Sequence, residues 1–323
     1  MPTLDEISPF HSGELEVQRR IGVDQQVADV GRRMIRDHLL QQHQDFYRTQ
    51  HQLLLALVDE DAQPWVAMVA AAPGFASALT PTRLRVDALP VAGPPTRSSD
   101  ARLRVGEQVG VLGIDYSNRR RNRVNGRIVS VDSDGFEMQV VQSFGNCPKY
   151  IQIRETQLPA EATWRAQPTP GAAVPALSHD TRALITQADH FYVATHYDRL
   201  GDEVHHGADV SHRGGKPGFV RINDKGSLVF PDLPGNRLFN TLGNIASNGK
   251  AALLFIDFNS ASLLSMTGTA QVDWRNASEH GFAQAERLVR FTPTEAWMYT
   301  HALPLAWRFK EQSPALEATG SWP

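Results

Sequence analysis

Two glycine-containing segments of this chain have the residue types that bind a phosphate-bearing ligand. Residues 235–237 (Gly-Asn-Arg) precede residues 240–247, whose composition predicts a short helix. The start of a helix exposes unpaired N–H groups, a guanidinium can donate to two phosphate oxygens, and glycine permits close backbone approach. Residues 213–216 (Arg-Gly-Gly-Lys) add a second basic segment. The pattern indicates a phosphate site, and an ordinary turn that caps a helix is the alternative.

The strand expected before the second segment would present a row of polar side chains. If residues 204–211 are extended, alternation places Asp209, Ser211 and Arg213 on one face and His212 on the other. Such a row, leading into a glycine turn, suits a flat ligand that accepts and donates hydrogen bonds. A strand that faces solvent is the alternative interpretation.

Three histidines near this strand could be considered as metal ligands. His205 and His206 are adjacent, so in a strand they point to opposite faces, and His212 follows at a distance. No cysteine pair and no HExxH spacing accompanies them. We therefore predict no metal site.

Residues 146–151 (Asn-Cys-Pro-Lys-Tyr-Ile) combine a cation with an aromatic hydrogen-bonding group in one turn. Lys149 and Tyr150 are therefore candidate ligand-binding residues. Cys147 is the only cysteine of the chain, which excludes an internal disulfide and favours a reducing compartment. Because the first residues also lack the apolar run of a signal peptide, we expect a cytoplasmic protein.

The densest charge run, residues 119–123 (Arg-Arg-Arg-Asn-Arg), is typical of a solvated hairpin tip. The alternative is that it faces a bound anion. The net charge of −3 is too small to indicate a nucleic-acid partner, and no run of about 18 apolar residues indicates a membrane segment. We expect neither partner.

The chain repeats itself once at long range. Pro-Gly-Phe at residues 73–75 recurs at 217–219, an offset of 217 − 73 = 144 positions. The segment around Asp115 recurs around Asp257, an offset of 257 − 115 = 142. Solenoid repeats are much shorter, about 20–50 residues, so this period predicts two copies of one domain fold.

Short β-like runs separated by turn signals make up both copies, and helical patterns at residues 12–22 and 25–47 precede them. The expected fold class is mainly β with helices (α+β), with a small six-stranded barrel in each copy. We expect a helical segment at 1–47, a first barrel at 48–159, a linker at 160–178 and a second barrel at 179–323. A further helix is expected at 277–288 and a late strand with a tail after it.

Residues 208–219, 231–245 and 252–258, with 146–151 of the first copy, resemble the pyridoxamine 5′-phosphate oxidase-like FMN-binding split barrels. The resemblance implies tandem six-stranded split β-barrels with FMN lying between two barrels. It implies that Asn236 and Arg237 hold the FMN phosphate, with Thr241 and Asn244 supporting that turn. The residues expected to line the flavin ring are Ser211, His212, Arg213 and Gly214. If the first copy acts as the partner barrel, residues 119–123, Lys149 and Tyr150 would reach across to the flavin.

The resemblance also implies an FMN-dependent oxidoreductase, one that transfers hydride or electrons between a reduced donor such as NAD(P)H and a small acceptor. No side chain is assigned a catalytic role. Residues 306–323 lack the basic and aromatic pattern that vitamin B6 oxidases use, so oxidation of that vitamin is not expected. The alternative is a non-catalytic flavin or haem carrier. The first copy lacks the phosphate turn, which predicts one FMN per chain, in a pseudo-dimer within the chain or in a homodimer.

Overall fold

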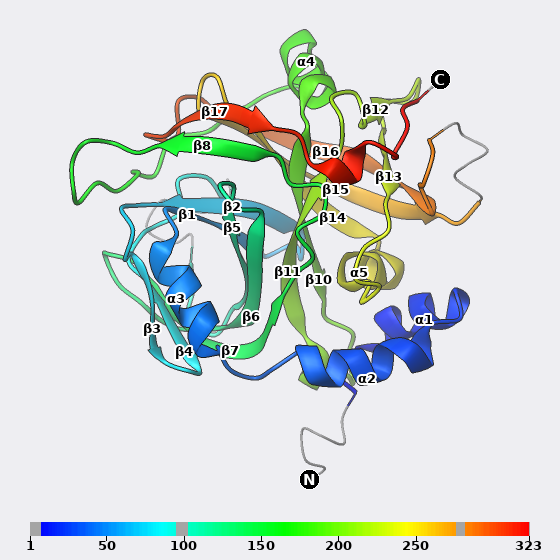
Figure 1. The fold of residues 1–323 in the computed structure, drawn as a ribbon, viewed down its shortest axis with the longest axis horizontal. Helices are drawn as coiled ribbons and strands as arrows, with labels where there is room; N and C mark the ends of the chain where they lie inside the picture. Colours follow the sequence, from blue (N-terminus) through cyan, green and yellow to red (C-terminus); the bar gives the residue numbers. More distant parts are fainter. Residues whose placement is uncertain (1–7, 95–102, 276–281, 323) are drawn as a thin grey trace.

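The computed structural model describes residues 8–94, 103–275 and 282–322. Most of the structure is β-sheet, with helices packed around two large antiparallel sheets (Figure 1). The first sheet follows the order β2-β1-β5-β6-β7-β4-β3. Its strands are β1 (Gln52–Val58), β2 (Pro64–Ala70), β3 (Ala76–Thr80), β4 (Arg83–Val86), β5 (Gln108–Asp115), β6 (Arg120–Val131) and β7 (Phe136–Gly145).

The second large sheet follows the order β11-β10-β14-β15-β16-β13-β12, with the short β9 beside β16. Adding nine to each strand number of the first sheet gives this same order. Its strands are β9 (Ala172–Ala173), β10 (His190–Tyr197), β11 (Gly207–Gly214), β12 (Arg221–Ile222), β13 (Leu228–Asp232), β14 (Lys250–Asp257), β15 (Ser262–Asp273) and β16 (Arg287–Tyr299).

Neither sheet is the closed six-stranded barrel that we expected. Among the described residues, the strand pairings of each sheet run as an open path of seven strands, and β9 pairs with β16 outside the second path. The sequence patterns missed β3, β8 (Ile153–Gln157) and β17 (Ala306–Glu311), which are partly exposed. β8 and β17 pair with each other in a separate two-stranded sheet across the top of Figure 1, so the tails of the two copies are joined.

Five α-helices pack against the described sheets, and two of them replace one expected helix. They are α1 (Ser12–Arg20), α2 (Asp24–Met34), α3 (Gln41–Thr49), α4 (His179–Gln187) and α5 (Asn240–Asn248), with 3₁₀ turns at Glu203–His205 and Pro314–Leu316. The helix expected at 25–47 is broken between α2 and α3, because the backbone of Arg36 exchanges hydrogen bonds with that of Ser143. Of the helix expected at 277–288, residues 277–281 lie outside the described residues, and Arg287 begins β16.

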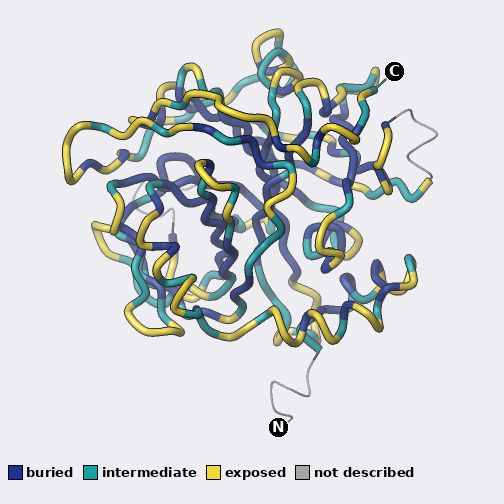
Figure 2. The backbone as a smooth tube through the Cα atoms, in the orientation of Figure 1, coloured by how far each residue is buried: buried dark blue, intermediate teal, exposed yellow. Residues whose placement is uncertain are grey.

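Each large sheet has its own hydrophobic core, and a third core lies where the two sheets meet. Leu54, Met68 and Leu112 of the first sheet pack there with Tyr192 and Val210 of the second. The central strands are buried on both faces, which explains why they consist of nearly continuous apolar runs (Figure 2).

The segment expected as a linker, residues 160–178, is packed rather than free. Trp164 and Ala166 are buried in the core between the sheets. The backbone of Arg165 forms a bridge with Ala71, and β9 pairs with β16.

Helices α1 and α2 lie at the lower right of Figure 1, where α1 packs against α5. α1 and α5 touch where a Cβ on Gly13 would lie 2.4 Å from the Gly243 carbonyl oxygen, a distance that excludes any larger residue. Across the described residues, every helix falls short of the length and apolar character that a bilayer-spanning helix needs.

Candidate functional site

A pocket lies between the two large sheets, at the start of α5. Every site residue predicted from the sequence lines it except Asn244. The first sheet and its tail contribute Arg121, Arg123, Asn146, Cys147, Lys149 and Tyr150; the second contributes Ser211, His212, Arg213, Gly214, Phe219, Pro231, Asp232, Leu233, Gly235, Asn236, Arg237, Phe239, Asn240, Thr241, Leu242 and Glu286.

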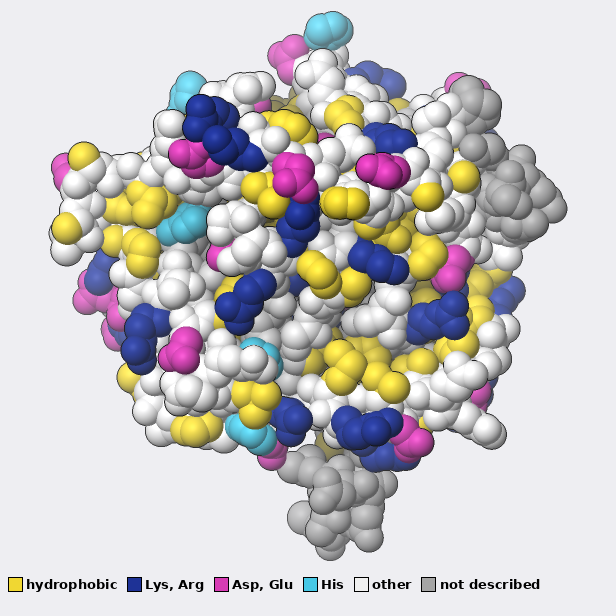
Figure 3. Space-filling view, viewed as in Figure 1, with side chains coloured by type: hydrophobic (Ala, Val, Ile, Leu, Met, Phe, Trp, Pro, Cys, Tyr) yellow, Lys and Arg dark blue, Asp and Glu magenta, His cyan; other side chains and the backbone are white. Residues whose placement is uncertain are grey.

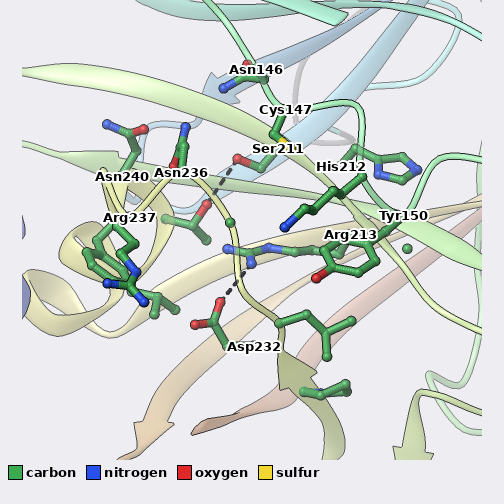
Figure 4. Close-up of a pocket in the computed structure, with 18 of the residues that line it drawn as sticks. Asn146, Cys147, Tyr150, Ser211, His212, Arg213, Asp232, Asn236, Arg237 and Asn240 are labelled. Atoms are coloured by element: carbon green, nitrogen blue, oxygen red, sulfur yellow. Dashed lines mark hydrogen bonds and ion pairs between the residues drawn. The ribbon is translucent and has the colours of Figure 1, made fainter. Parts of the chain in front are cut away.

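Alternation along β11 supplies one wall of the pocket, as the sequence pattern predicted. Ser211 and Arg213 share a face, and the Arg213 guanidinium donates to Asp232 at 2.8 Å (Figure 4). Asp232 also pairs with Arg287 at 2.9 Å. Arg287 also pairs with Glu286, so two arginines meet two carboxylates at this point. The pocket lining as a whole remains cationic, because five basic residues outnumber two carboxylates: Arg121, Arg123, Lys149, Arg213 and Arg237 against Asp232 and Glu286.

The deepest part of the pocket is an ionic cluster that joins both sheets. Arg123 of β6 is only 4% exposed and pairs with Asp209 of β11 at 2.6 Å. Its guanidinium also donates to the Ser211 hydroxyl and, at 3.1 Å, to the Asn240 Oδ1. The Thr241 hydroxyl donates to Ser211 at 3.1 Å. Burial lowers the pKa of Arg123 and raises that of Asp209, so both charges depend on this pairing.

The arginine run is therefore not a solvated hairpin tip. In β6 the alternate residues Arg121 and Arg123 point into the molecule, and Arg119 donates to the Ile151 carbonyl and to Glu311. The Arg121 guanidinium donates to the Cys147 carbonyl at 2.7 Å, and burial lowers the pKa of Arg121 to about 10. These two arginines face the pocket of the other sheet.

The turn before α5 uses unusual backbone angles. Arg237 and Phe239 have φ of +61° and +64°, the left-handed region that non-glycine residues seldom adopt. The Asn236 side chain accepts from the Leu238 N–H at 3.1 Å, which stabilises the turn. Phe239, the N-cap of α5, makes no side-chain cap hydrogen bond. Arg237 is half exposed and lies 3.8 Å from Glu286, so its charge is available to a ligand.

The segment after β7 closes another side of the pocket. The Tyr150 hydroxyl donates to the Pro234 carbonyl at 3.0 Å, and its N–H donates to Ser313 at 3.2 Å. A Cβ on Gly214 would lie 1.9 Å from the Tyr150 carbonyl oxygen, so only glycine permits this approach. Lys149 is exposed at the rim.

Several buried polar atoms of the pocket wall lack a partner. Among the described residues, none is in hydrogen-bonding position to the Nε of Arg123, the Nε of Arg213 or the Oδ1 of Asn146. A buried donor or acceptor without a partner costs about 1–3 kcal/mol, which a ligand with complementary groups would relieve. The wall therefore fits a ligand that carries an anion and flat hydrogen-bonding groups.

Two predicted site residues have their side chains away from this wall. The side-chain amide of Asn244, on α5, donates to the hydroxyl of Thr195 in β10 at 2.9 Å. The side chain of His212 is on the opposite face of β11 from Ser211, stacked on His190 with ring centroids 5.0 Å apart. Burial lowers the pKa of His212 well below its usual value.

The other two histidines considered as ligands are engaged elsewhere. His205 contacts Asp202 and the Ser8 carbonyl through its two ring nitrogens, and His206 contacts the Arg199 carbonyl. No cluster of three or more potential metal-ligating side chains occurs within the described ranges.

The equivalent position in the first sheet is filled with apolar residues. Strand registers place Ala67 and Val69 where the second sheet has Ser211 and Arg213. Ala67 and Val69 belong to the hydrophobic core of the first sheet, together with Leu53, Leu55 and Phe75. The same strand order therefore carries a polar pocket on one side and a packed core on the other.

Sequence reasoning missed Asp232 and Asn240, which complete the pocket. The assignment of Arg121 and Arg123 was left open between a solvated tip and an anion site. Arg121 and Arg123 are two positions apart, and alternate residues of a strand share a face. This spacing was the sequence signal that both could point to the same site. No local pattern marked Asn240, whose partners lie far away in the chain.

No protein-family model and no curated protein matches this chain. Several solved structures are similar over part of it. HupZ of group A Streptococcus is 13% identical, covers 45% of this chain and 98% of its own, and has a TM-score of 0.30. A putative pyridoxamine 5′-phosphate oxidase of Lactobacillus delbrueckii is 18% identical, covers 37% of this chain and 92% of its own, and has a TM-score of 0.29. An FAD-binding protein of Mycobacterium smegmatis is 12% identical, covers 40% of this chain and 98% of its own, and has a TM-score of 0.25.

Proposed function

We propose that the chain is an FMN-binding flavoprotein and an oxidoreductase that exchanges hydride or electrons between a reduced donor such as NAD(P)H and a small acceptor. The observation that carries this proposal is the pocket at the uncapped start of α5, where Arg123 and Arg213 are held by carboxylates yet keep unpartnered N–H groups. Helix starts and arginine forks are the common protein groups for phosphate.

The residues of the pocket fit the two parts of FMN. Arg123, Arg237 and the hydroxyls of Ser211 and Thr241 would hold the phosphate at the start of α5. Leu238, where the related barrels often have a second cation, is buried, so Arg123 from the other sheet would supply that charge. The flavin ring would lie along the backbone of residues 211–214 and against residues 146–150.

A bound flavin would supply the two-electron chemistry, and the protein would supply position and electrostatics. Arg121, whose partner is the uncharged Cys147 carbonyl, would stabilise negative charge near the ring, and Arg213 would add a hydrogen bond through the Nε that Asp232 leaves unpartnered. Tyr150 would fix the opening of the pocket through its bond to Pro234. No side chain is needed as an obligatory acid or base in this proposal.

The two sheets would be tandem split barrels that form a pseudo-dimer within one chain. Their common strand order and the cluster that joins β6 to β11 support this arrangement. The first copy would act as the partner barrel, and its own position is filled by the hydrophobic core of the first sheet, so one FMN per chain is expected. Homodimerisation through other surfaces is compatible with the same site.

The decisive experiment is an absorption spectrum of the purified protein with released flavin quantified per chain. About one FMN per chain supports the proposal, and flavin bands that bleach with NADH or NADPH under anaerobic conditions support the oxidoreductase. Stable binding without reduction by any donor would favour the alternative, a flavin carrier. A protein that is colourless and binds no added FMN would remove the proposal.

A further inference from the structure

Helix α1 precedes both large sheets in the chain. Two of its buried polar side chains contact the wall of the pocket. Glu14 is 3% exposed and Gln18 is fully buried. Gln18 donates to the Leu238 carbonyl at 3.1 Å, inside the turn that precedes α5. Glu14 accepts from the side-chain amide of Asn240, the first residue of α5. α1 therefore contacts both sides of the turn that would hold the phosphate.

The carboxylate of Glu14 has a local role as well, but that role does not explain its burial. Together with the N-cap His11 it forms a capping box, in which it accepts from the His11 N–H at 2.9 Å. A capping box needs only reciprocal hydrogen bonds between the side chains and backbone N–H groups of the N-cap and N3 residues, and burial of the carboxylate is no part of it. Here the close contact of Gly13 with Gly243 presses the carboxylate against α5, and its second oxygen is used on Asn240.

Asn240 transmits this contact to the ligand side. Its Nδ2 donates to Glu14 and its Oδ1 accepts from Arg123 at 3.1 Å. A side-chain amide has one oxygen and one NH₂ group. Because Glu14 accepts from the NH₂ group of Asn240, the oxygen of that amide is oriented toward Arg123. Arg123 in turn holds Ser211 and Asp209.

We propose that Glu14 is a positioning residue for the anion site, which orients Asn240 and thereby Arg123, and that the protonation of Glu14 tunes anion affinity. This inference rests on the proposed function. Hydrogen bonds link every step from Glu14 to the pocket wall.

The sign of the pH dependence follows from the charges around Glu14. Burial raises the pKa of Glu14 to about 8, and the facing charged groups are His11, Asp209 and Arg123. Above this pKa an ionised Glu14 partly neutralises Arg123 and repels a bound phosphate. Below it the carboxyl is neutral and leaves the charge of Arg123 to the ligand. Anion affinity should therefore fall as the pH rises through 8, and binding near pH 8 should take up protons.

The test compares FMN and riboflavin binding, by quenching of flavin fluorescence, at pH 7 and pH 9. For the wild-type protein the FMN Kd should rise roughly three- to tenfold between these pH values, whereas riboflavin, which has no phosphate, should show little change. Glu14→Gln cannot ionise, and its single oxygen can still accept from Asn240 if the bond to the His11 N–H is given up. This variant should therefore bind FMN at pH 7 and lose the pH dependence. Glu16→Gln, an exposed change on the same helix, is the matched control and should behave as wild type.

Further outcomes separate this inference from the proposed function. If the wild-type protein binds no FMN, both the proposed function and this inference are overturned. If the wild-type protein binds FMN and Glu14→Gln keeps the wild-type pH profile, only this inference is overturned. If Glu14→Gln does not fold, proton uptake when the wild-type protein binds FMN at pH 8, measured calorimetrically in two buffers and compared with riboflavin, replaces it. Uptake supports the inference, and its absence contradicts it.

Discussion

At the scale of single residues, the pocket contains two kinds of arginine that differ in what their removal would do. Arg123 is buried with Asp209, so its loss would leave a buried carboxylate unpaired and cost about 3–5 kcal/mol of stability. Arg237 is half exposed and only 3.8 Å from Glu286, a geometry that contributes little to folding. Only the second residue tests ligand binding without disturbing the fold.

Arg237→Ala should weaken FMN binding by about 10- to 100-fold, because a charge-assisted hydrogen bond to phosphate contributes about 1.5–3 kcal/mol. The melting temperature of the flavin-free protein should change by no more than about 2 °C, since the ion pair it loses is largely exposed. Fluorescence titration and thermal melts measure the two effects. Arg33→Ala, an exposed arginine of α2, should leave both unchanged, and equal losses of affinity in the two variants would contradict the assignment.

At the scale of elements, the pocket depends on close backbone contacts between segments that are distant in sequence. β11 touches the segment after β7 at Gly214, and α1 touches α5 at Gly13. In both places the position of one element is set by a glycine that lets the other approach. A side chain there would move the element and, with it, the pocket wall.

Gly214→Ala should destabilise the protein by about 1–3 kcal/mol and also weaken FMN binding, because the new Cβ would lie 1.9 Å from the Tyr150 carbonyl oxygen. Gly145→Ala is a matched control in β7: a Cβ at this position has no neighbouring atom within 4 Å. Thermal denaturation and FMN titration of both variants provide the measurement. Wild-type stability and affinity in Gly214→Ala would show that the contact at Tyr150 does not shape the site.

At the scale of the whole molecule, burial of many titratable groups makes stability depend on pH. Burial lowers the pKa of several histidines, to about 4 for His11. Because an unfolded histidine titrates near 6.5, the unfolded chain binds more protons below that pH and stability is lost as the pH falls. Glu14 and Asp209, whose pKa values are raised, act in the opposite direction. The histidines with lowered pKa are His11, His43, His51, His190, His196 and His212.

Because the histidines outnumber the opposing carboxyls, the melting temperature should fall by several degrees between pH 7 and pH 5. Differential scanning calorimetry of the flavin-free protein across this range is the measurement. A melting temperature that is flat or rises on acidification would mean that these histidines are hydrated or paired in solution.

The sequence by itself determined the local chemistry: the β-rich texture, the repeat, the helix after residues 235–237 and the row of polar side chains in β11. These depend on periodicity and turn chemistry, which are properties of neighbouring residues. Only the tertiary structure decided that Arg123 meets Asp209 and Asn240, that α1 supports α5, that His212 stacks on His190, and that the sheets are open paths. Contacts between residues that are distant in sequence depend on how the two sheets pack, and no local pattern encodes that packing.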